Sequence, residues 1–165
     1  MTLATLPVPS LSITVGGYLN GSLADGSTYQ QERMSIYALR DGDLFFYVGR
    51  SELTLRRLEQ HIGSIYDRAN VSEVGWLIRD NLPNSLSWGI DLYMPQDWGC
   101  LNYDAPGAEN RAIKALRPCL NVAMNPDPRS LPARYRKEEA NWRKQIDGRM
   151  QTLNMDELRR KLIAR

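Results

Sequence analysis

The chain contains few of the side chains that most often bind zinc. One histidine, His61, and two cysteines, Cys100 and Cys119, are present in 165 residues. Zinc sites draw several of their ligands from His and Cys, so zinc hydrolases and His-metal nucleases are nearly excluded. Two cysteines that stand apart form neither a zinc knuckle nor a disulfide framework. We therefore expect buried thiols in a reducing compartment.

Long apolar runs are also absent from the sequence. No stretch approaches the ~20 apolar residues that a bilayer-spanning helix needs. Residues 1–9 lack the charged start and the apolar run of a secretory signal. We therefore expect a cytoplasmic protein that does not associate with membranes. Its apolar fraction of 42% and charged fraction of 24% are ordinary values for a globular chain with one hydrophobic core.

Charge is nearly balanced overall but unevenly distributed along the chain. The net charge is +2, yet residues 126–165 contain 11 Lys and Arg against 6 Asp and Glu, which is +5 and leaves −3 for residues 1–125. Of the 21 cationic side chains, 17 are arginine, whose planar guanidinium suits bidentate phosphate contacts. The composition favours a nucleic-acid partner. The expected DNA-binding residues lie in the basic tail: Arg134, Arg136, Lys137, Arg143 and Lys144.

Three segments can be distinguished by their sequence patterns. Turn signals punctuate residues 1–31, which we interpret as an N-terminal arm with one hairpin. Residues 126–165 are polar and basic, and we expect a helical extension there, with helices at about 132–152 and 155–164. Residues 32–125 lie between them and carry the patterns of a folded core.

The core is predicted to be α+β, with a three-stranded antiparallel sheet flanked by helices. Two β-branched and aromatic runs are joined by Asp41-Gly42-Asp43, a strong hairpin signal. Ser51 is a suitable N-cap for a helix in which apolar residues recur at helical spacing. Asp104-Ala105-Pro106 begins another helix, which Pro118 ends. The expected elements are strands at 35–39, 44–48 and 87–94, and helices at 52–62, 71–80 and from 105 onward.

Several motifs of this core occur in a recognisable order. Ser35-Ile36-Tyr37 is followed by Tyr47-Val48-Gly49, with Arg57 ten residues after Tyr47 and His61 four further on. Later in the chain, Glu109 opens a helix that leads to Pro118 and Asn121. In this joint pattern, over roughly half of the chain, the sequence resembles the GIY-YIG endonuclease superfamily. Two departures are Ser35 in place of the first glycine and Arg50, where many relatives have lysine or a small residue.

The resemblance implies a divalent-metal-dependent endonuclease that cuts DNA. By family likeness Glu109 would hold one Mg²⁺ or Mn²⁺ ion, a hard cation that prefers carboxylate oxygen. Arg57 would contact the scissile phosphate, with Arg50 assisting, and Tyr37 would be the general base. Tyr47 and His61 complete the expected catalytic group, and Gly49 and Asn121 would support it.

The same residues can be judged from elementary chemistry. Arg57 and His61 are i and i+4 neighbours on the predicted helix, so they project from one side of it. Glu109 aligns with Ile113 and Leu116, which aims a carboxylate along an apolar face, where a bound cation would explain it better than a helix-dipole contribution of ~0.3–1 kcal/mol. A free phenol, with a pKa of ~10, is too weak a base at neutral pH by roughly 4 kcal/mol. A hydrogen bond from Tyr37 to His61 is expected to help remove that deficit.

Other readings of the sequence remain. No Asp or Glu is followed two positions later by lysine, which disfavours the PD-(D/E)xK nucleases, and one histidine cannot furnish an HNH site. Strand tyrosines and surface helix arginines are ordinarily structural. The alternative function is a catalytically silent nucleic-acid-binding or assembly subunit. Within the enzyme interpretation, a restriction-type or mobile-element nuclease acting on double-stranded DNA is expected. A homodimer is one hypothesis for its assembly, and a subunit targeted by a partner protein or guide RNA is the other.

Overall fold

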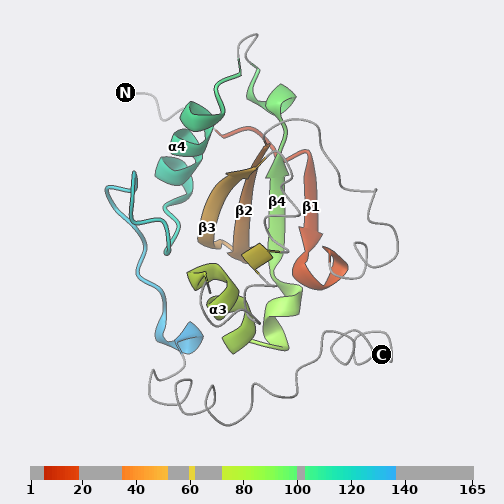
Figure 1. Ribbon diagram of the computed structural model, residues 1–165, viewed down its shortest axis with the longest axis vertical. Helices are drawn as coiled ribbons and strands as arrows, with labels where there is room; N and C mark the ends of the chain where they lie inside the picture. Colours follow the sequence, from red (N-terminus) through yellow and green to blue (C-terminus); the bar gives the residue numbers. More distant parts are fainter. Residues whose placement is uncertain (1–5, 19–34, 52–59, 62–71, 100–102, 137–165) are drawn as a thin grey trace. The chain divides into compact units, whose positions relative to one another are not determined.

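The computed structural model describes residues 6–18, 35–51, 60–61, 72–99 and 103–136, and those up to residue 131 form an α+β fold around an antiparallel sheet (Figure 1). The sheet has four strands in the order β1-β4-β2-β3. Their bounds are Leu11–Thr14 for β1, Ser35–Asp41 for β2, Leu44–Ser51 for β3 and Gly89–Tyr93 for β4. The predicted three-stranded sheet was therefore wrong by one strand, because β1 comes from the segment that was interpreted as an N-terminal arm.

The additional strand is short and pairs with one neighbour. Leu11 lies opposite Leu92 and Thr14 opposite Gly89, so the whole of β1 runs antiparallel to β4. Residues 15–18 are helical, so Gly16 and Gly17 lie in a helical turn and not in the turn of a hairpin. A four-residue strand gives little periodicity to recognise, and its partner lies far away in the sequence. The remaining turn signals of the arm, at residues 20–26, fall outside the described residues.

The β2–β3 hairpin agrees with its sequence signal. Gly42 in the turn has a φ of 57°, a backbone conformation that glycine adopts without strain. The register pairs Tyr37 with Gly49 and Ile36 with Arg50, and a bulge interrupts it between Leu39 and Arg40. Because strand side chains alternate, consecutive residues of each strand face opposite sides of the sheet. One side carries Ile36, Ala38, Val48 and Arg50, and the other carries Tyr37, Leu39, Tyr47 and Gly49.

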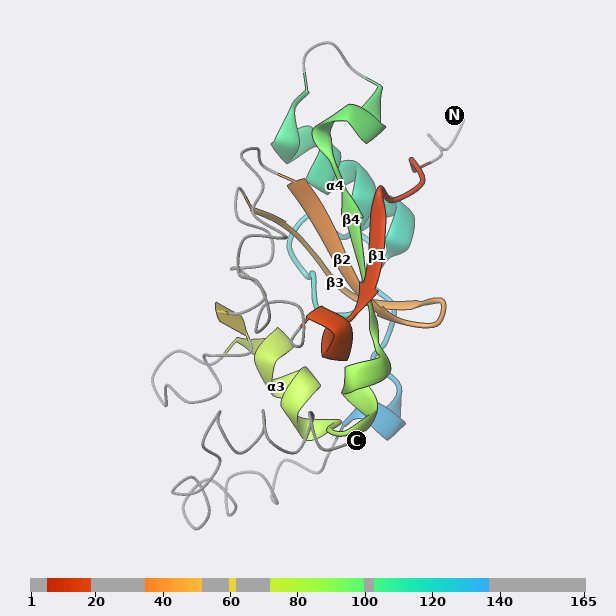
Figure 2. The same cartoon turned by 90° about the vertical axis from the view of Figure 1, so that its right-hand side faces the viewer.

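Helix α4, Ala105–Leu116, covers the first of these sides (Figures 1 and 2). Its N-cap is Asp104, whose carboxylate accepts a hydrogen bond from the Gly107 N–H at 3.1 Å. It ends at Arg117, which has a φ of 51°, immediately before Pro118. Both ends agree with the prediction. Buried residues of α4 pack against the sheet and the turn after β4 in one hydrophobic cluster. Its members are Ile36, Ala38, Val48, Tyr93, Trp98, Ala108, Ala112 and Ile113.

Helix α3, Glu73–Asp80, also lies where a helix was predicted. Ser72 is its N-cap, and a 3-10 turn at Asn84–Ser87 leads from it into β4. Figure 1 shows α3 near the end of the sheet at which β1 ends and β4 begins. Residues 60 and 61 are helical, and the rest of the helix predicted at 52–62 lies outside the described residues.

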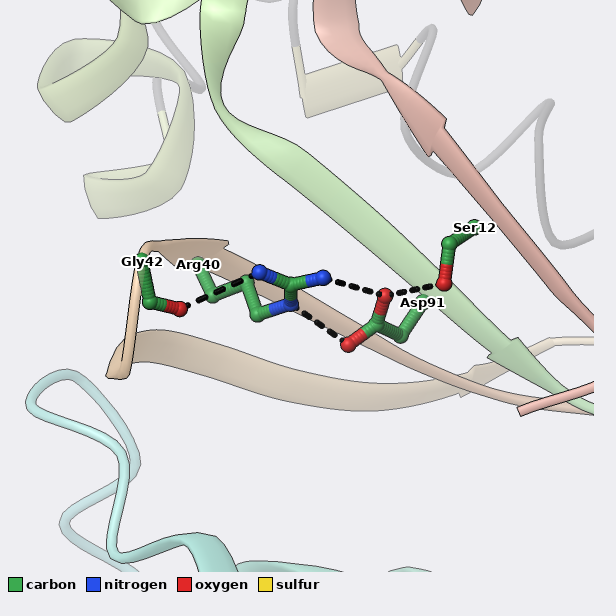
Figure 3. Close-up of polar contacts among 4 residues, drawn as sticks. All are labelled: Ser12, Arg40, Gly42 and Asp91. Carbon is green, nitrogen blue, oxygen red and sulfur yellow. Dashed lines mark hydrogen bonds and ion pairs between the residues drawn. The ribbon is translucent and has the colours of Figure 1, made fainter. Parts of the chain in front are cut away.

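A buried carboxylate, with an arginine and a serine as partners, joins three of the strands (Figure 3). Asp91 on β4 is 4% exposed, and its carboxylate accepts hydrogen bonds from Arg40 Nε on β2 at 2.7 Å and from Ser12 Oγ on β1 at 2.6 Å. Arg40 also donates to the Gly42 carbonyl at 3.1 Å. These contacts therefore fix β1 and β2 on either side of β4.

The chain divides into two compact units, residues 1–131 and residues 132–165. In the second unit, a 3-10 turn spans Ala133–Tyr135 where the start of an α-helix at 132 was predicted. Its C-cap residue, Arg136, has an extended backbone, so no α-helix continues through it. The predicted helical residues from 137 onward lie outside the described residues. Within the described ranges, no helix has the length and apolar character needed to cross a membrane.

Candidate active site

Two of the predicted catalytic residues are joined by a hydrogen bond, as expected from the sequence. Tyr37 Oη on β2 lies 3.2 Å from Nε2 of His61. Tyr47 on β3 stands beside both, with its ring centroid 6.0 Å from that of Tyr37 and 5.6 Å from that of His61. Tyr37 and His61 are 1% and 7% exposed. The side of the sheet opposite α4 thus carries a packed cluster of two phenols and one imidazole.

Gly49 makes room for this cluster. A Cβ atom at Gly49 would lie 2.7 Å from Cζ and Oη of Tyr37 and 2.8 Å from Cε1 of Tyr47. Contacts that short do not occur between folded side chains, so any larger residue would displace a phenol. The glycine of the second motif is therefore needed for space beside the Tyr37 ring, which the register places directly opposite it.

The second nitrogen of His61 also has a partner, which the sequence did not identify. Nδ1 lies 2.7 Å from Ser72 Oγ, the N-cap hydroxyl of α3. A serine before a helical pattern is a recognisable capping signal. Its contact with a histidine 11 residues earlier depends on how α3 packs, which no local pattern reveals.

Glu109 and Arg50 form a second group of polar residues. Arg50 Nε lies 3.1 Å from Glu109 Oε2, and the Glu109 side chain is 14% exposed. Burial raises the pKa of the Glu109 carboxyl, and the Arg50 guanidinium lowers it only in part. The carboxylate is thus turned toward the protein, as its alignment with the apolar face of α4 predicted. The described structure pairs Arg50 with Glu109, whereas the prediction was a contact with phosphate.

A tyrosine that the sequence analysis did not single out lies close to this ion pair. Burial raises the pKa of Tyr103, with Asp104 adding to the shift, while Arg111 and Arg50 oppose it and Glu109 contributes to it. Its hydroxyl is buried and has no hydrogen-bond partner among the described residues. The Oδ1 atom of Asn110, the residue after Glu109 in the chain, is also buried and has no hydrogen-bond partner among the described residues. Unsatisfied buried oxygens are unusual, and they mark the surroundings of Glu109 as polar.

Asn121 supports β3 from its outer edge. Its Oδ1 accepts a hydrogen bond from the Val48 N–H at 2.8 Å, and its Nδ2 donates to the Val48 carbonyl at 2.8 Å. The neighbouring N–H groups of Cys119 and Leu120 donate to the carbonyls of Phe45 and Phe46. The segment after α4 therefore continues the sheet beyond its edge strand, and Asn121 fixes the strand one residue before Gly49.

The two groups lie on opposite sides of the β2–β3 pair. Tyr37, Tyr47 and His61 are on one side, and Arg50 and Glu109 are on the side that α4 covers. The two groups are connected through β3, because Gly49 faces the first group and Arg50, the next residue in the strand, belongs to the second. The sequence predicted one convergent site, and the described residues form two half-sites at the same end of an edge strand.

Several predicted residues cannot be placed relative to these half-sites. Arg57, which would contact the phosphate, lies outside the described residues, as do Lys137, Arg143 and Lys144. Arg134 and Arg136 belong to the second unit, where Arg134 stacks its guanidinium 4.7 Å from the Tyr135 ring centroid and donates to the Tyr135 hydroxyl at 2.8 Å.

In the described part of the site, Glu109 is the carboxylate that could bind a metal ion. Among the described residues, no group of three or more His, Cys, Asp or Glu side chains could hold a metal ion. Mg²⁺ keeps several of its waters and can bind through one or two carboxylates. Glu109 fits that kind of binding, since Arg50 Nε contacts one of its carboxylate oxygens, Oε2, and the unpartnered Tyr103 hydroxyl lies close enough for the charge of Glu109 to act on it.

Comparisons of the chain with protein-family models, with curated proteins and with solved structures find no match.

Proposed function

We propose that this protein is a divalent-metal-dependent endonuclease that hydrolyses phosphodiester bonds of double-stranded DNA. The observation that supports this proposal most directly is the hydrogen bond between Tyr37 and His61 beside the Tyr47 ring. Tyr47 lies on β3, the strand that also carries Arg50 of the Arg50–Glu109 pair. The buried Tyr37 hydroxyl has as its partner an imidazole, a group that can accept its proton, and the largely buried Glu109 carboxylate carries a charge that Arg50 contacts at one oxygen.

In this proposal each half-site has one chemical task. Tyr37 takes a proton from the attacking water, after passing its own proton to Nε2 of His61. Tyr47 packs against both rings and limits their orientation. Arg57 neutralises charge on the scissile phosphate, since a guanidinium is protonated at every physiological pH. Arg50 holds one oxygen of Glu109 in place.

Glu109 would hold the metal ion through the carboxylate oxygen that Arg50 does not contact. When bound, Mg²⁺ or Mn²⁺ supplies Lewis-acid stabilisation of the negative charge that develops on the leaving oxygen. Tyr103 contributes a polar atom close to the carboxylate, where the waters of a hydrated cation would need hydrogen-bond partners.

Two observations favour a second candidate, a catalytically silent nucleic-acid-binding or assembly subunit. Tyr37 is 1% exposed, whereas a general base must reach a water molecule. The Arg50 guanidinium also occupies one side of the Glu109 carboxylate, the group that would bind the metal. In this candidate both groups stabilise the fold, and the arginine-rich chain contacts DNA without cutting it.

The biological setting that fits the proposed enzyme is a restriction-type or mobile-element-type nuclease in the cytoplasm. Cutting both strands requires two active centres, so we propose that it acts as a homodimer. Targeting by a partner protein or by a guide RNA is the alternative to direct reading of the DNA sequence. Light scattering with bound DNA distinguishes a dimer from a monomer, and a monomeric cleaving complex would contradict the dimer.

The test of the proposed function is cleavage of varied double-stranded DNA by the full chain with Mg²⁺ or Mn²⁺. Glu109→Gln keeps the shape of the side chain but removes the charge that binds a cation, so we expect cleavage to be lost while DNA binding is retained. The matched control is Glu73→Gln, which changes an exposed glutamate in the first turn of α3. This control should cleave like the wild type.

A metal-binding measurement separates the two candidates even if the cognate DNA is not among the substrates. Mg²⁺ that binds the folded chain at Glu109 raises its melting temperature in proportion to the logarithm of its concentration above the dissociation constant. We expect this rise in the wild type and in Glu73→Gln but not in Glu109→Gln. Equal behaviour of all three proteins in both assays would favour the binding subunit.

A further inference from the structure

The imidazole of His61 is held between two hydroxyl groups. Tyr37 Oη is 3.2 Å from Nε2 and Ser72 Oγ is 2.7 Å from Nδ1. The edge of the ring also meets Tyr47, with an interplanar angle of 71°. Of the described residues, Tyr37 and Tyr47 are the titratable side chains placed against this ring. Both nitrogens therefore have a fixed partner on a side chain that is itself held by secondary structure.

Ser72 is fixed by its position at the start of α3. It has an extended backbone, with φ −76° and ψ 147°, and its Oγ accepts the Gly75 N–H at 3.1 Å as the helix N-cap. A serine hydroxyl has two acceptor lone pairs and one proton. The helix uses one lone pair, and the same oxygen lies 2.7 Å from His61 Nδ1, a distance at which it can accept a second hydrogen bond. The capping geometry thus aims a hydrogen-bond acceptor at the imidazole.

The relative acidity of the two hydroxyls decides which way the protons are arranged. A phenol, with a pKa of ~10, is a much stronger acid than an aliphatic alcohol and is the better hydrogen-bond donor. This difference favours donation from Tyr37 to Nε2, with the ring proton on Nδ1 and Nδ1–H donating to Ser72 Oγ. We propose that Ser72 is a positioning residue that holds His61 in the Nδ1–H tautomer, so that Nε2 can accept the proton of Tyr37. The catalytic meaning of this inference rests on the proposed nuclease function.

The proton movements balance around this arrangement. The Tyr37 proton moves to Nε2, which leaves a phenolate and an imidazolium whose Nδ1–H remains bonded to Ser72. The phenolate then takes a proton from water as the water oxygen forms its bond to phosphorus and the bond from phosphorus to the leaving oxygen breaks. His61 loses its added proton to solvent, and the leaving oxygen gains one from solvent. Ser72 contacts no reacting atom and acts through the imidazole alone.

The inference can be tested by NMR without DNA or metal, because the chain contains one histidine. The ¹⁵N shifts of the two ring nitrogens report which of them carries the proton in the neutral form. We expect Nδ1 to be protonated in the wild type. Protonation at Nε2 in the wild type would overturn the proposal, because the ring could then no longer accept the proton of Tyr37.

Three substitutions at position 72 separate positioning from capping. Ser72→Gly removes the hydroxyl but keeps a residue that is suitable at an N-cap, and Ser72→Thr keeps both functions. We expect the Nδ1–H preference to be lost in Ser72→Gly and retained in Ser72→Thr. Ser72→Asp is also a good cap and places a carboxylate against Nδ1–H, which stabilises the imidazolium. The midpoint of the His61 titration should move upward in this variant.

Cleavage assays then connect the tautomer to turnover. In a cleaving wild type, we expect a roughly tenfold slower rate and a shifted pH–rate profile for Ser72→Gly, with Ser72→Thr close to wild type. An unchanged tautomer and profile in Ser72→Gly would overturn the role of Ser72. If the wild type shows the expected tautomer but cleaves no DNA in the tests above, the proposed nuclease fails while the positioning of His61 by Ser72 stands.

Discussion

Gly49 on β3 lies directly opposite Tyr37 on β2, and the Tyr37 ring occupies the space that a Cβ atom at position 49 would need. The contact would be 2.7 Å, which is too short for two carbon atoms. This relationship gives a physical reason for a glycine in the second motif that does not depend on catalysis. It also predicts how the Tyr37–His61 contact responds to a single methyl group.

Gly49→Ala should displace Tyr37 and destabilise the fold by about 1–3 kcal/mol, the usual cost of overpacking. The comparison is Gly89→Ala on β4, where a Cβ would meet the Arg40 side chain at 3.3 Å, so that a shift of a few tenths of an ångström would accommodate it. Urea unfolding measures both costs, and the histidine NMR signal reports on the Tyr37 contact. An unchanged histidine environment in Gly49→Ala would contradict the prediction.

Asn121→Ala should destabilise the fold by about 1–3 kcal/mol, because it leaves the N–H and carbonyl of Val48 without their side-chain partners. Asn84→Ala is a suitable control, since Asn84 is exposed at the start of a 3-10 turn. Hydrogen exchange of the Val48 amide tests the mechanism. Its protection should fall in Asn121→Ala and remain in the control. Equal stability of the two variants would mean that the edge of β3 does not depend on Asn121.

Asp91→Ala should cost about 2 kcal/mol, since it leaves the partly exposed Arg40 guanidinium and the Ser12 hydroxyl without their shared acceptor (Figure 3). The comparison is Asp127→Ala, which breaks the ion pair of Asp127 with Arg117 on the surface and should cost at most about 1 kcal/mol. Unfolding free energies in low and high salt measure the difference. If Asp91→Ala lowers the unfolding free energy by no more than Asp127→Ala does, the Arg40–Asp91 pair contributes no more to stability than an ion pair on the surface.

Tyr93 makes the stability of the sheet depend on alkaline pH. Burial raises its pKa from 10.0 to about 12, with the charge of Asp91 adding and Arg40 opposing. The pKa in the folded state is therefore above the unfolded value. The stabilising contribution is fully present below about pH 10 and is lost as the pH rises toward about 12.

Tyr93→Phe should remove this contribution, which is on the order of 2 kcal/mol. The difference in unfolding free energy between wild type and Tyr93→Phe should change by that amount between about pH 9.5 and pH 12, and be constant at lower pH. Denaturant unfolding at a series of alkaline pH values measures it. Parallel curves for the two proteins across this range would rule out a titration of Tyr93 coupled to folding.

The sequence was most informative where the physical cause of a structure is local. The hairpin turn at Gly42, the cap at Asp104 and the end of α4 before Pro118 each depend on backbone preferences within a few residues. Helical spacing also indicated that Glu109 would turn toward the protein, and the need to lower the pKa of a tyrosine base suggested the Tyr37–His61 contact. Those features are present in the structure. The catalytic roles attached to these residues stay predictions.

Tertiary structure alone decided which distant segments meet. Ser12 and Asp91 are 79 residues apart, and their contact exists because a four-residue strand from the predicted arm pairs with β4. The placement of Ser72 against His61 depends in the same way on the packing of α3. The separation of Tyr37 from Glu109 by the sheet follows from strand alternation combined with the register of β2 and β3. Residue patterns determine where elements begin and end and which of their faces are apolar. Which elements become neighbours depends on which apolar faces can be buried against one another, and this is determined by interactions between segments that are far apart in the sequence.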